Sequence, residues 1–479
     1  MGALGLGVHH TNIAPRTVPP WRDSGRALHR MVFRAGRRSA QFHSWGTPLI
    51  ALKKKSMRHI LIIAYSYPPL MEAQSIRWAH LSRELIKKGD EVDVLTIRLP
   101  EYYKDGLDLV RKASVHRTYP GPLQALFFRT KARLRVEDKP FQEKRKSFTH
   151  QVLRRTYDGV RRLMNLVLIP DLRTEWLFFA LPELRRLMRK KRYDLVISSH
   201  EPGVDHLLGL VAKVFYQVCW MGDFSDPMVT FYTPRLRRPV DRRVQGALLK
   251  RMDSILVTNQ RLKEEFLAEY SFLSPDRIRV LTQGFDDESW KGQQRPRTDR
   301  GRLCLVYTGT FYRGVRDPGE LFEALRSLSE EIDVELVIAG RNDGFVEDAR
   351  RLGLLGKRVT FVGYLRYEDS IRIQQGADVL VHLGNLSANQ VPGKVYEYLG
   401  AGKPILAIFR DPGDEGKELV LKLQRGVVAF DESSKIREAI VSLWDLFQRG
   451  RLQSTFRLSL EEVSRYSWGS LSNLLTAAG

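Results

Sequence analysis

The strongest constraint on the fold of this chain is a regular alternation of short apolar runs with amphipathic, helix-like segments. His59 to Tyr65 has the pattern of a strand, Ser75 to Lys88 that of a helix, and Glu91 to Thr96 that of the next strand. Such a β-α-β unit predicts parallel strands joined by a crossover helix. Four further strands are predicted in this half: Leu195 to Ser199, Gln217 to Met221, Ser254 to Val257 and Ile278 to Leu281.

A second series of the same kind follows a segment at Trp290 to Arg302, whose Arg, Gln and Gly residues indicate a linker. Pro318 to Leu328 has the pattern of one of its helices. Its predicted strands are Leu303 to Tyr307, Val334 to Ala339, Val359 to Val362, Val379 to His382, Ile405 to Ile408 and Val427 to Phe430. A length of 479 residues suits two domains. We therefore expect an α/β protein of two Rossmann-like, doubly wound parallel-sheet domains facing across a cleft, where ligands bind.

The expected organisation has five parts: a basic extension at 1–56, an N-terminal domain at 57–289, the linker at 290–302, a C-terminal domain at 303–460, and a last helix at 461–479 that packs back on the N-terminal domain. The extension contains ten Lys or Arg residues, Asp23 as its one acid and no clear period, which predicts disorder. Because a sharp strand begins just after Met57, an incorrectly assigned start is one interpretation. A transit peptide is the other.

The chain has a net charge of +23, and a second group of basic residues lies within about 111–192. We interpret this segment as an insertion of basic helices in the N-terminal domain. Its basic residues, interleaved with Phe and Leu, include Arg129, Lys131, Arg133, Arg135, Lys144, Arg145, Lys146, Arg154, Arg155, Arg161 and Arg162. Such a face suits an anionic membrane surface, and a solvated basic face is the alternative. Since no apolar run reaches roughly 18 residues, we expect a cytoplasmic protein, peripheral on the inner face of the membrane if this face binds lipid.

The two cysteines, Cys219 and Cys304, lie far apart in apolar runs, which favours reduced thiols over a disulfide or a metal site.

One short helix between Val391 and Pro404 carries charged residues at a spacing that suits a nucleotide sugar. The residues that delimit it are Pro392, Gly393, Gly402 and Pro404. Lys394 lies at its positive N-terminal end, which favours a diphosphate, and Glu397 lies one turn later, where it can accept two ribose hydroxyls. The alternative is an exposed ion pair on an ordinary helix.

Several motifs extend this interpretation to residues 57 to about 470. They are Tyr67-Pro-Pro69, Trp220 to Pro227, Gln283 to Asp286, Tyr307 to Thr310, Ala339-Gly340 and Pro392 to Pro404. Their order resembles that of GT-B glycosyltransferases of the retaining family 4 (group 1) type. The resemblance implies that the C-terminal domain binds a nucleotide-diphosphate sugar and the N-terminal domain a glycan or lipid-linked acceptor. It also implies transfer with retention of configuration, without a metal or another cofactor.

Charge on the departing diphosphate requires cations and backbone N–H groups. We expect Arg316 and Lys394 to be these catalytic cations. For Arg316, a helix-terminal pair with Asp317 or Glu320 is the alternative.

The resemblance also assigns the donor-binding residues. Gly309 permits backbone approach after its strand, whereas Thr310 stands where the family commonly has an Arg. Of the two acids in the family's Glu-x7-Glu pattern, Glu397 matches the second and Asn389 replaces the first. An amide still hydrogen-bonds a sugar hydroxyl, so both are expected to contact the donor.

On the acceptor side we expect Pro69, Arg77, Asp223 and Asp226. His200 and His206 follow a strand and are further catalytic candidates, with a helix-capping or core histidine as the alternative for each. The leaving phosphate can itself take the acceptor proton, so a protein base is not required.

Three functions remain open at this stage. The first is a sugar transferase of surface polysaccharide or glycolipid biosynthesis, and the second is a GT-B-like nucleotide-sugar epimerase or hydrolase. The third is a nucleic-acid binder, which only the charge suggests.

Overall fold

The structure is a computed structural model that describes residues 57–70, 72–100, 113–137, 159, 164, 168–230, 233–290, 301–385 and 391–476. The basic extension, Asn389 and most of the predicted linker therefore lie outside the described residues. So do seven of the basic residues named above: Lys144, Arg145, Lys146, Arg154, Arg155, Arg161 and Arg162. Among the helices of the described part, none is long and apolar enough to cross a bilayer.

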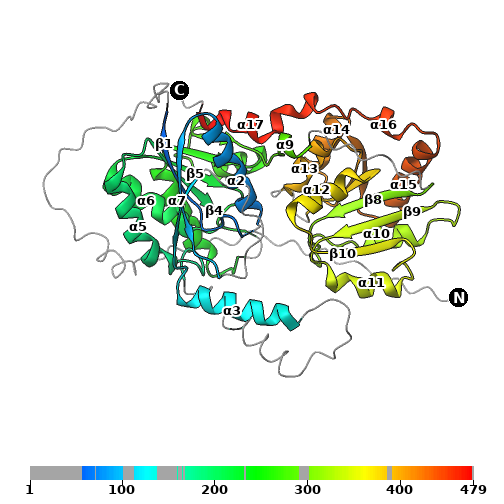
Figure 1. The fold of residues 1–479 in the computed structure, drawn as a ribbon, viewed down its shortest axis with the longest axis horizontal. Helices are drawn as coiled ribbons and strands as arrows, with labels where there is room; N and C mark the ends of the chain where they lie inside the picture. Colours follow the sequence, from blue (N-terminus) through cyan, green and yellow to red (C-terminus); the bar gives the residue numbers. More distant parts are fainter. Residues whose placement is uncertain are drawn as a thin grey trace, which may run out of the picture. The chain divides into compact units, whose positions relative to one another are not determined.

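The first domain contains a seven-stranded parallel sheet in the order β3-β2-β1-β4-β5-β6-β7. Figure 1 labels β1, β4 and β5 of this sheet. The strands are β1 (His59–Ile63), β2 (Glu91–Ile97), β3 (Ser114–Thr118), β4 (Leu195–His200), β5 (Cys219–Phe224), β6 (Ser254–Val257) and β7 (Ile278–Val280). All six predicted strands of this half are confirmed, with ends shifted by up to three residues. The chain builds outward from β1 to β3 and then returns to the other side of β1 with β4.

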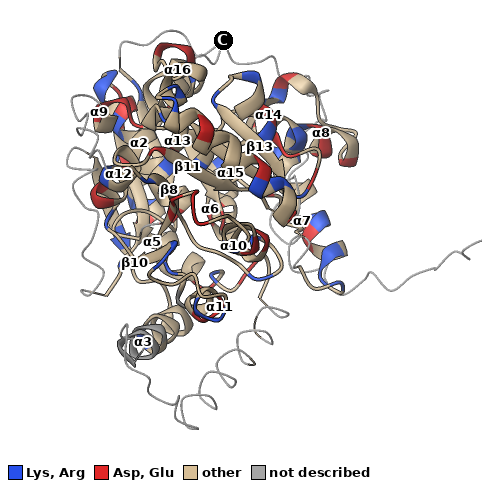
Figure 2. Cartoon of the chain, turned by 90° about the vertical axis from the view of Figure 1, so that its right-hand side faces the viewer, with Lys and Arg blue, Asp and Glu red and all other residues tan. Residues whose placement is uncertain are grey.

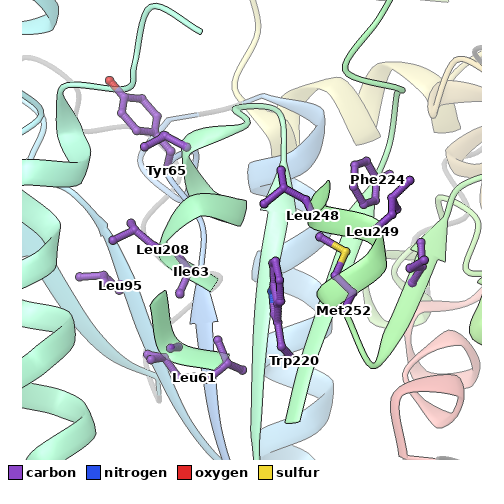
Figure 3. Close-up of a cluster of buried hydrophobic side chains, with 14 of the residues drawn as sticks. Leu61, Ile63, Tyr65, Leu95, Leu208, Trp220, Phe224, Leu248, Leu249 and Met252 are labelled. Carbon is purple, nitrogen blue, oxygen red and sulfur yellow. The ribbon is translucent and has the colours of Figure 1, made fainter. Parts of the chain in front are cut away.

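Helices cover both faces of this sheet because successive strand residues point to opposite sides. Leu61 and Ile63 enter one core, with α5 (Trp176–Lys190), α6 (Val204–Tyr216), α7 (Arg238–Arg251) and α8 (Gln260–Glu269). Figure 3 shows part of this core. Ile60 and Ile62 enter the other core, with α2 (Ala73–Lys87) and α17 (Trp468–Leu471).

The predicted insertion at 111–192 is wrong at both ends. Residues 114–118 form β3, which pairs with β2 along its whole length and is the edge of the sheet. Its sequence, Ser-Val-His-Arg-Thr, lacks an apolar signal because an edge strand is only half buried. At the other end α5 packs on the sheet through a stripe of buried residues: Trp176, Ala180, Leu184 and Leu187. Between them, α3 spans Pro122–Glu137.

The second domain contains a six-stranded parallel sheet in the order β10-β9-β8-β11-β12-β13. Its strands are β8 (Leu303–Thr308), β9 (Val334–Ala339), β10 (Val359–Gly363), β11 (Val379–Leu383), β12 (Ile405–Phe409) and β13 (Gly426–Phe430). All six predicted strands are confirmed within one residue at each end. The two doubly wound parallel sheets thus confirm the predicted fold class.

One face of this sheet packs against α10 (Gly319–Arg326), α11 (Val346–Arg351) and α15 (Ser433–Gln448), and the other against α12 (Tyr367–Gln375), α13 (Lys394–Ala401) and α14 (Glu415–Lys422). The helices carry charges of both signs: α11 has acids in its first turn and arginines in its last, whereas α7 is mainly basic with Asp241 as its acid (Figure 2). The sheets themselves supply the apolar cores.

The short helices α9 (Asp287–Trp290), α16 (Leu452–Thr455) and α18 (Asn473–Thr476) complete the described helices. The C-terminal segment consists of short helical turns where one helix was expected. Its Trp468, Leu471 and Leu475 lie in the same core as α2 of the first domain.

Candidate functional site

The strand order of the second domain places a topological switch point at the carboxyl ends of β8 and β11. The chain runs from β8 outward to β10 and then resumes at β11 on the other side of β8. Loops that leave two such neighbouring strands diverge, and ligands of open α/β sheets bind between them. The predicted donor residues follow or flank these two strands.

The turn after β8 is held by hydrogen bonds within the domain. Gly309 donates its N–H to the carbonyl of Ala339 at 2.9 Å, and its own carbonyl accepts from Asn342 Nδ2 at 2.9 Å. Asn342 Oδ1 accepts the N–H of Phe311 at 2.7 Å. A Cβ at Gly340, whose φ is +138°, would lie 1.9 Å from the Gly309 carbonyl oxygen. Asn342 was not predicted from the sequence, although an amide two residues after Ala339-Gly340 was a usable signal.

Arg316 links the loops that follow β8 and β11. Its Nε and Nη2 donate to Asn385 Oδ1 at 3.1 and 2.7 Å, which is neither of the carboxylate partners considered from the sequence. Asn385 is buried. Because this partner is a neutral amide, and no carboxylate of the described residues forms an ion pair with Arg316, the guanidinium charge remains available to an anion.

A histidine lies next to this cation but adds no charge. His382, on β11, is buried, and burial together with the Arg316 charge lowers its pKa to about 3. It is therefore neutral at physiological pH.

The predicted helix between Val391 and Pro404 is confirmed as α13, with Gly402 in the left-handed conformation at its end (φ 60°, ψ 32°). Lys394 Nζ contacts Glu397 Oε1 at 2.7 Å, so the predicted ion pair forms. It is not an ordinary surface pair: the Glu397 side chain is 10% exposed and that of Lys394 is 32% exposed.

A polar network that the sequence analysis missed connects Glu397 to β8. Gln374 on α12 donates from Nε2 to Glu397 Oε1 and to Thr308 Oγ1, the latter at 3.0 Å. Thr308 in turn donates its N–H to Tyr398 OH at 2.9 Å. The available signal was a glutamine three residues after Ile371, on the buried face of a helix.

Two of the predicted acceptor-side residues are enclosed in the first domain. Arg77 Nη2 pairs with Asp223 Oδ1 at 2.9 Å, and both side chains are fully buried. Trp78 Nε1 also donates to Asp223, and Arg77 Nη1 donates to the carbonyl of Thr282. An acceptor would reach this pair only by breaking it, since burial and hydrogen bonds occupy both groups.

The structure places both candidate histidines in the core. His206 Nδ1 lies 2.7 Å from Ser198 Oγ, and the His200 ring stacks on that of His206 at 5.8 Å between centroids. Burial lowers the pKa of both rings, which favours neutral core histidines, the alternative considered from the sequence. His200 Nδ1 contacts the carbonyl of Asp226, whose side chain is half-buried, and Pro69 is buried after β1.

The structure thus joins Glu397 with Lys394, and Arg316 with the β11 loop, in one domain. Thr310 is half-buried beside Gly309. Neither Cys219 nor Cys304 forms a disulfide, and the described residues contain no group of three His, Cys, Asp or Glu side chains suited to a metal ion.

Solved structures share this architecture. A sucrose-phosphate synthase from Thermosynechococcus elongatus is 16% identical with a TM-score of 0.59, covering 88% of this chain and 97% of that one. Anabaena HepE (Alr3699), solved in complex with UDP and glucose, is 14% identical with a TM-score of 0.60 and coverages of 88% and 98%. A putative UDP-N-acetylglucosamine 2-epimerase from Listeria monocytogenes is 15% identical with a TM-score of 0.53, and the match covers 88% of this chain and 95% of that one. At these identities the likeness shows the GT-B fold alone.

Comparison with models of protein families identifies the family of this chain, which the shared fold does not. Residues 73–284 match the glycosyl transferase 4-like domain, and residues 289–442 match the glycosyl transferases group 1. A search of curated proteins found no match. The two family matches together cover about three quarters of the chain. The chain therefore belongs to the group 1 glycosyltransferases of the GT-B fold and is a glycosyltransferase.

Proposed function

We propose that this enzyme moves a sugar from a nucleotide-diphosphate donor to a glycan or lipid-linked acceptor with retention of configuration. The observation that carries the proposal is the buried Glu397 carboxylate, on a side chain that is 10% exposed. Lys394 and Gln374 both donate to its Oε1, whereas no described residue donates to its Oε2. An oxygen held in this way is suited to accept hydroxyl hydrogen bonds from a ribose. The complex of HepE with UDP and glucose, on the same fold, supports a nucleotide donor.

The cations and backbone N–H groups of the second domain would stabilise the leaving diphosphate. Arg316 pairs with no carboxylate of the described part of the chain, and Lys394 begins α13, where the helix dipole also favours an anion. The N–H of Thr310 lies in the turn after β8, whereas that of Gly309 is donated to the carbonyl of Ala339. Such preorganised groups favour departure of the diphosphate without a metal ion.

The proposed reaction requires no protein base. The acceptor oxygen bonds to the anomeric carbon on the face where the bond to the diphosphate oxygen breaks. The bonding electrons leave with the diphosphate, whose oxygen takes the proton of the acceptor hydroxyl. The buried environment of His200 and His206 supports this assignment.

An acceptor at an anionic membrane would place the enzyme at the cytoplasmic face, in surface polysaccharide or glycolipid assembly. The exposed aromatic residues near the start of α5 support this part of the proposal. Phe178 is 73% exposed, and Phe179 packs edge-on against the exposed Tyr119 at 5.1 Å between ring centroids. Basic residues follow along the same helix: Arg185, Arg186, Arg189 and Lys190. Aromatic and basic residues together favour the membrane interface.

A thermal-shift panel of UDP-, GDP-, ADP- and CMP-sugars tests the donor assignment. One class should stabilise the wild type and lose its effect in Glu397→Ala. Glu438→Ala is the matched control, because Lys435 and Glu438 form an ion pair of the same spacing on α15 with both side chains more than half exposed. Stabilisation of the wild type by none of these donors would contradict the proposal.

A transfer assay separates a transferase from the epimerase or hydrolase alternatives. Labelled sugar should appear in extracted lipid or glycan when the stabilising donor is supplied. Conversion of the donor without any labelled acceptor would favour the alternatives.

A further inference from the structure

Gln374 is an unusual residue for the position it occupies. It lies on α12 with no exposed surface, in a helix that packs against the sheet through Ile371. A buried amide is retained only when its hydrogen bonds offset its desolvation. Its Nε2 has three acceptors within reach: Glu397 Oε1, Thr308 Oγ1 at 3.0 Å and Ser370 Oγ at 3.3 Å.

These bonds join the two parts of the donor site. Thr308 is the last residue of β8 and directly precedes the turn at Gly309, whereas Glu397 belongs to α13. Among the described residues, Gln374 is the side chain that hydrogen-bonds to both. It therefore fixes the carboxylate relative to the strand end that carries the phosphate-side turn.

The direction of the bonds determines which carboxylate oxygen remains for a ligand. Gln374 and Lys394 both donate to Oε1 of Glu397, and donation to a carboxylate requires the amide nitrogen to face it. Rotation of the carboxylate would break both bonds. Oε2 is thus held in one orientation, with no donor among the described residues.

We propose that Gln374 is a positioning residue that orients Glu397 toward the ribose and so sets the discrimination of the enzyme between ribose and deoxyribose nucleotides. This inference rests on the proposed nucleotide-sugar function. It extends that function by assigning a specificity role to a side chain that touches Glu397 and not the donor.

Calorimetric binding of UDP, GDP and ADP, each against its 2′-deoxy form, tests the proposal. Hydrogen bonds to charged groups are worth about 1.5–3 kcal/mol, so the wild type should bind the deoxy form of its preferred nucleotide about tenfold or more weakly. In Gln374→Leu this ratio should fall toward one, because the carboxylate is no longer held. Gln375→Leu is the matched control: Gln375 is the next residue of the same helix, also buried, and its side chain has no hydrogen bond to Glu397. The ratio in that variant should remain at the wild-type value.

A purely structural role would lower the melting temperature of Gln374→Leu and leave the ratio unchanged, and that result would overturn the proposal. If the leucine variant fails to fold, Gln374→Asn keeps the test, since its shorter amide cannot reach Thr308 and Glu397 together. The double variant of Gln374→Leu with Glu397→Gln should show no further loss beyond Glu397→Gln alone. Failure of all three nucleotides to bind the wild type would refute the nucleotide-sugar function itself, whereas binding with an unchanged ratio in the Gln374 variants would refute this inference alone.

Discussion

The two domains bury charged pairs in different ways. Arg77 and Asp223 of the first domain are fully enclosed, and their polar atoms are used by each other, by Trp78 and by backbone carbonyls. Lys394 and Glu397 of the second domain lie at the end of a helix beside solvent, and both bonds to the carboxylate reach one oxygen. The first pair is saturated and serves the fold. The second retains capacity for a ligand.

The largest effect is expected where the saturated pair is broken. Asp223→Ala leaves the Arg77 guanidinium buried without its partner, which should lower the free energy of unfolding by about 3–5 kcal/mol. Urea unfolding measures this loss. Glu438→Ala, which breaks an exposed pair on α15, should change stability by less than about 1 kcal/mol. Equal losses of unfolding free energy in the two variants would show that the enclosed Arg77–Asp223 pair contributes no more to stability than an exposed ion pair.

For the Lys394–Glu397 pair we expect a large effect on nucleotide binding and a small effect on stability. Lys394→Ala removes the proposed charge-assisted contact to the diphosphate and should weaken nucleotide binding by about tenfold to a hundredfold, with a small effect on stability. Titration calorimetry with the preferred nucleotide measures the change, and Lys435→Ala on α15 is the control of equal spacing. Wild-type affinity in Lys394→Ala would show that this pair, too, serves only the fold.

Acid should lower the stability of the packing around α2. His80 on α2 is fully buried, its ring stacks on Trp468 at 5.7 Å, and burial lowers its pKa to about 4 despite Asp286 at 3.9 Å. The unfolded chain takes up this proton below pH 6.5 and the folded protein only near pH 4, so stability is complete above 6.5 and decreases as the pH falls.

From this one residue we expect a loss of about 2 kcal/mol between pH 7 and pH 5. Unfolding curves at both pH values measure it. His80→Leu should flatten this part of the dependence. An equal loss in that variant would assign the effect to other groups.

The smallest expected effect concerns the surface of the first domain. Phe178→Ser removes an apolar side chain that is 73% exposed and should weaken sedimentation with anionic vesicles by roughly tenfold. Phe215→Ser is a matched control, because Phe215 on α6 is 74% exposed. If both variants bind vesicles as the wild type does, Phe178 does not belong to a membrane-binding surface.

Local signals were sufficient for most of the fold. The apolar runs predicted all strands except β3, because that edge strand is polar and its pairing with β2 is invisible in the sequence. They also predicted α13 with its Gly402 end. The candidate site was only partly predictable: Glu397 and Lys394 lie one turn apart, but Asn385 and Gln374 carried no signal that named their partners.

The sequence by itself therefore determined the alternation of strands and helices and the spacing of Lys394 and Glu397. These features depend on residues only a few positions apart, because helix hydrogen bonds and the alternation of side chains along a strand are both short-range. The tertiary structure decided the strand order, and with it the switch point at the carboxyl ends of β8 and β11. It also decided which polar groups meet: Gln374 with Glu397 over 23 residues, Arg316 with Asn385 over 69, and Arg77 with Asp223 over 146. Such partners depend on how sheets and helices pack, because a local pattern is compatible with several strand orders and only long-range packing selects one.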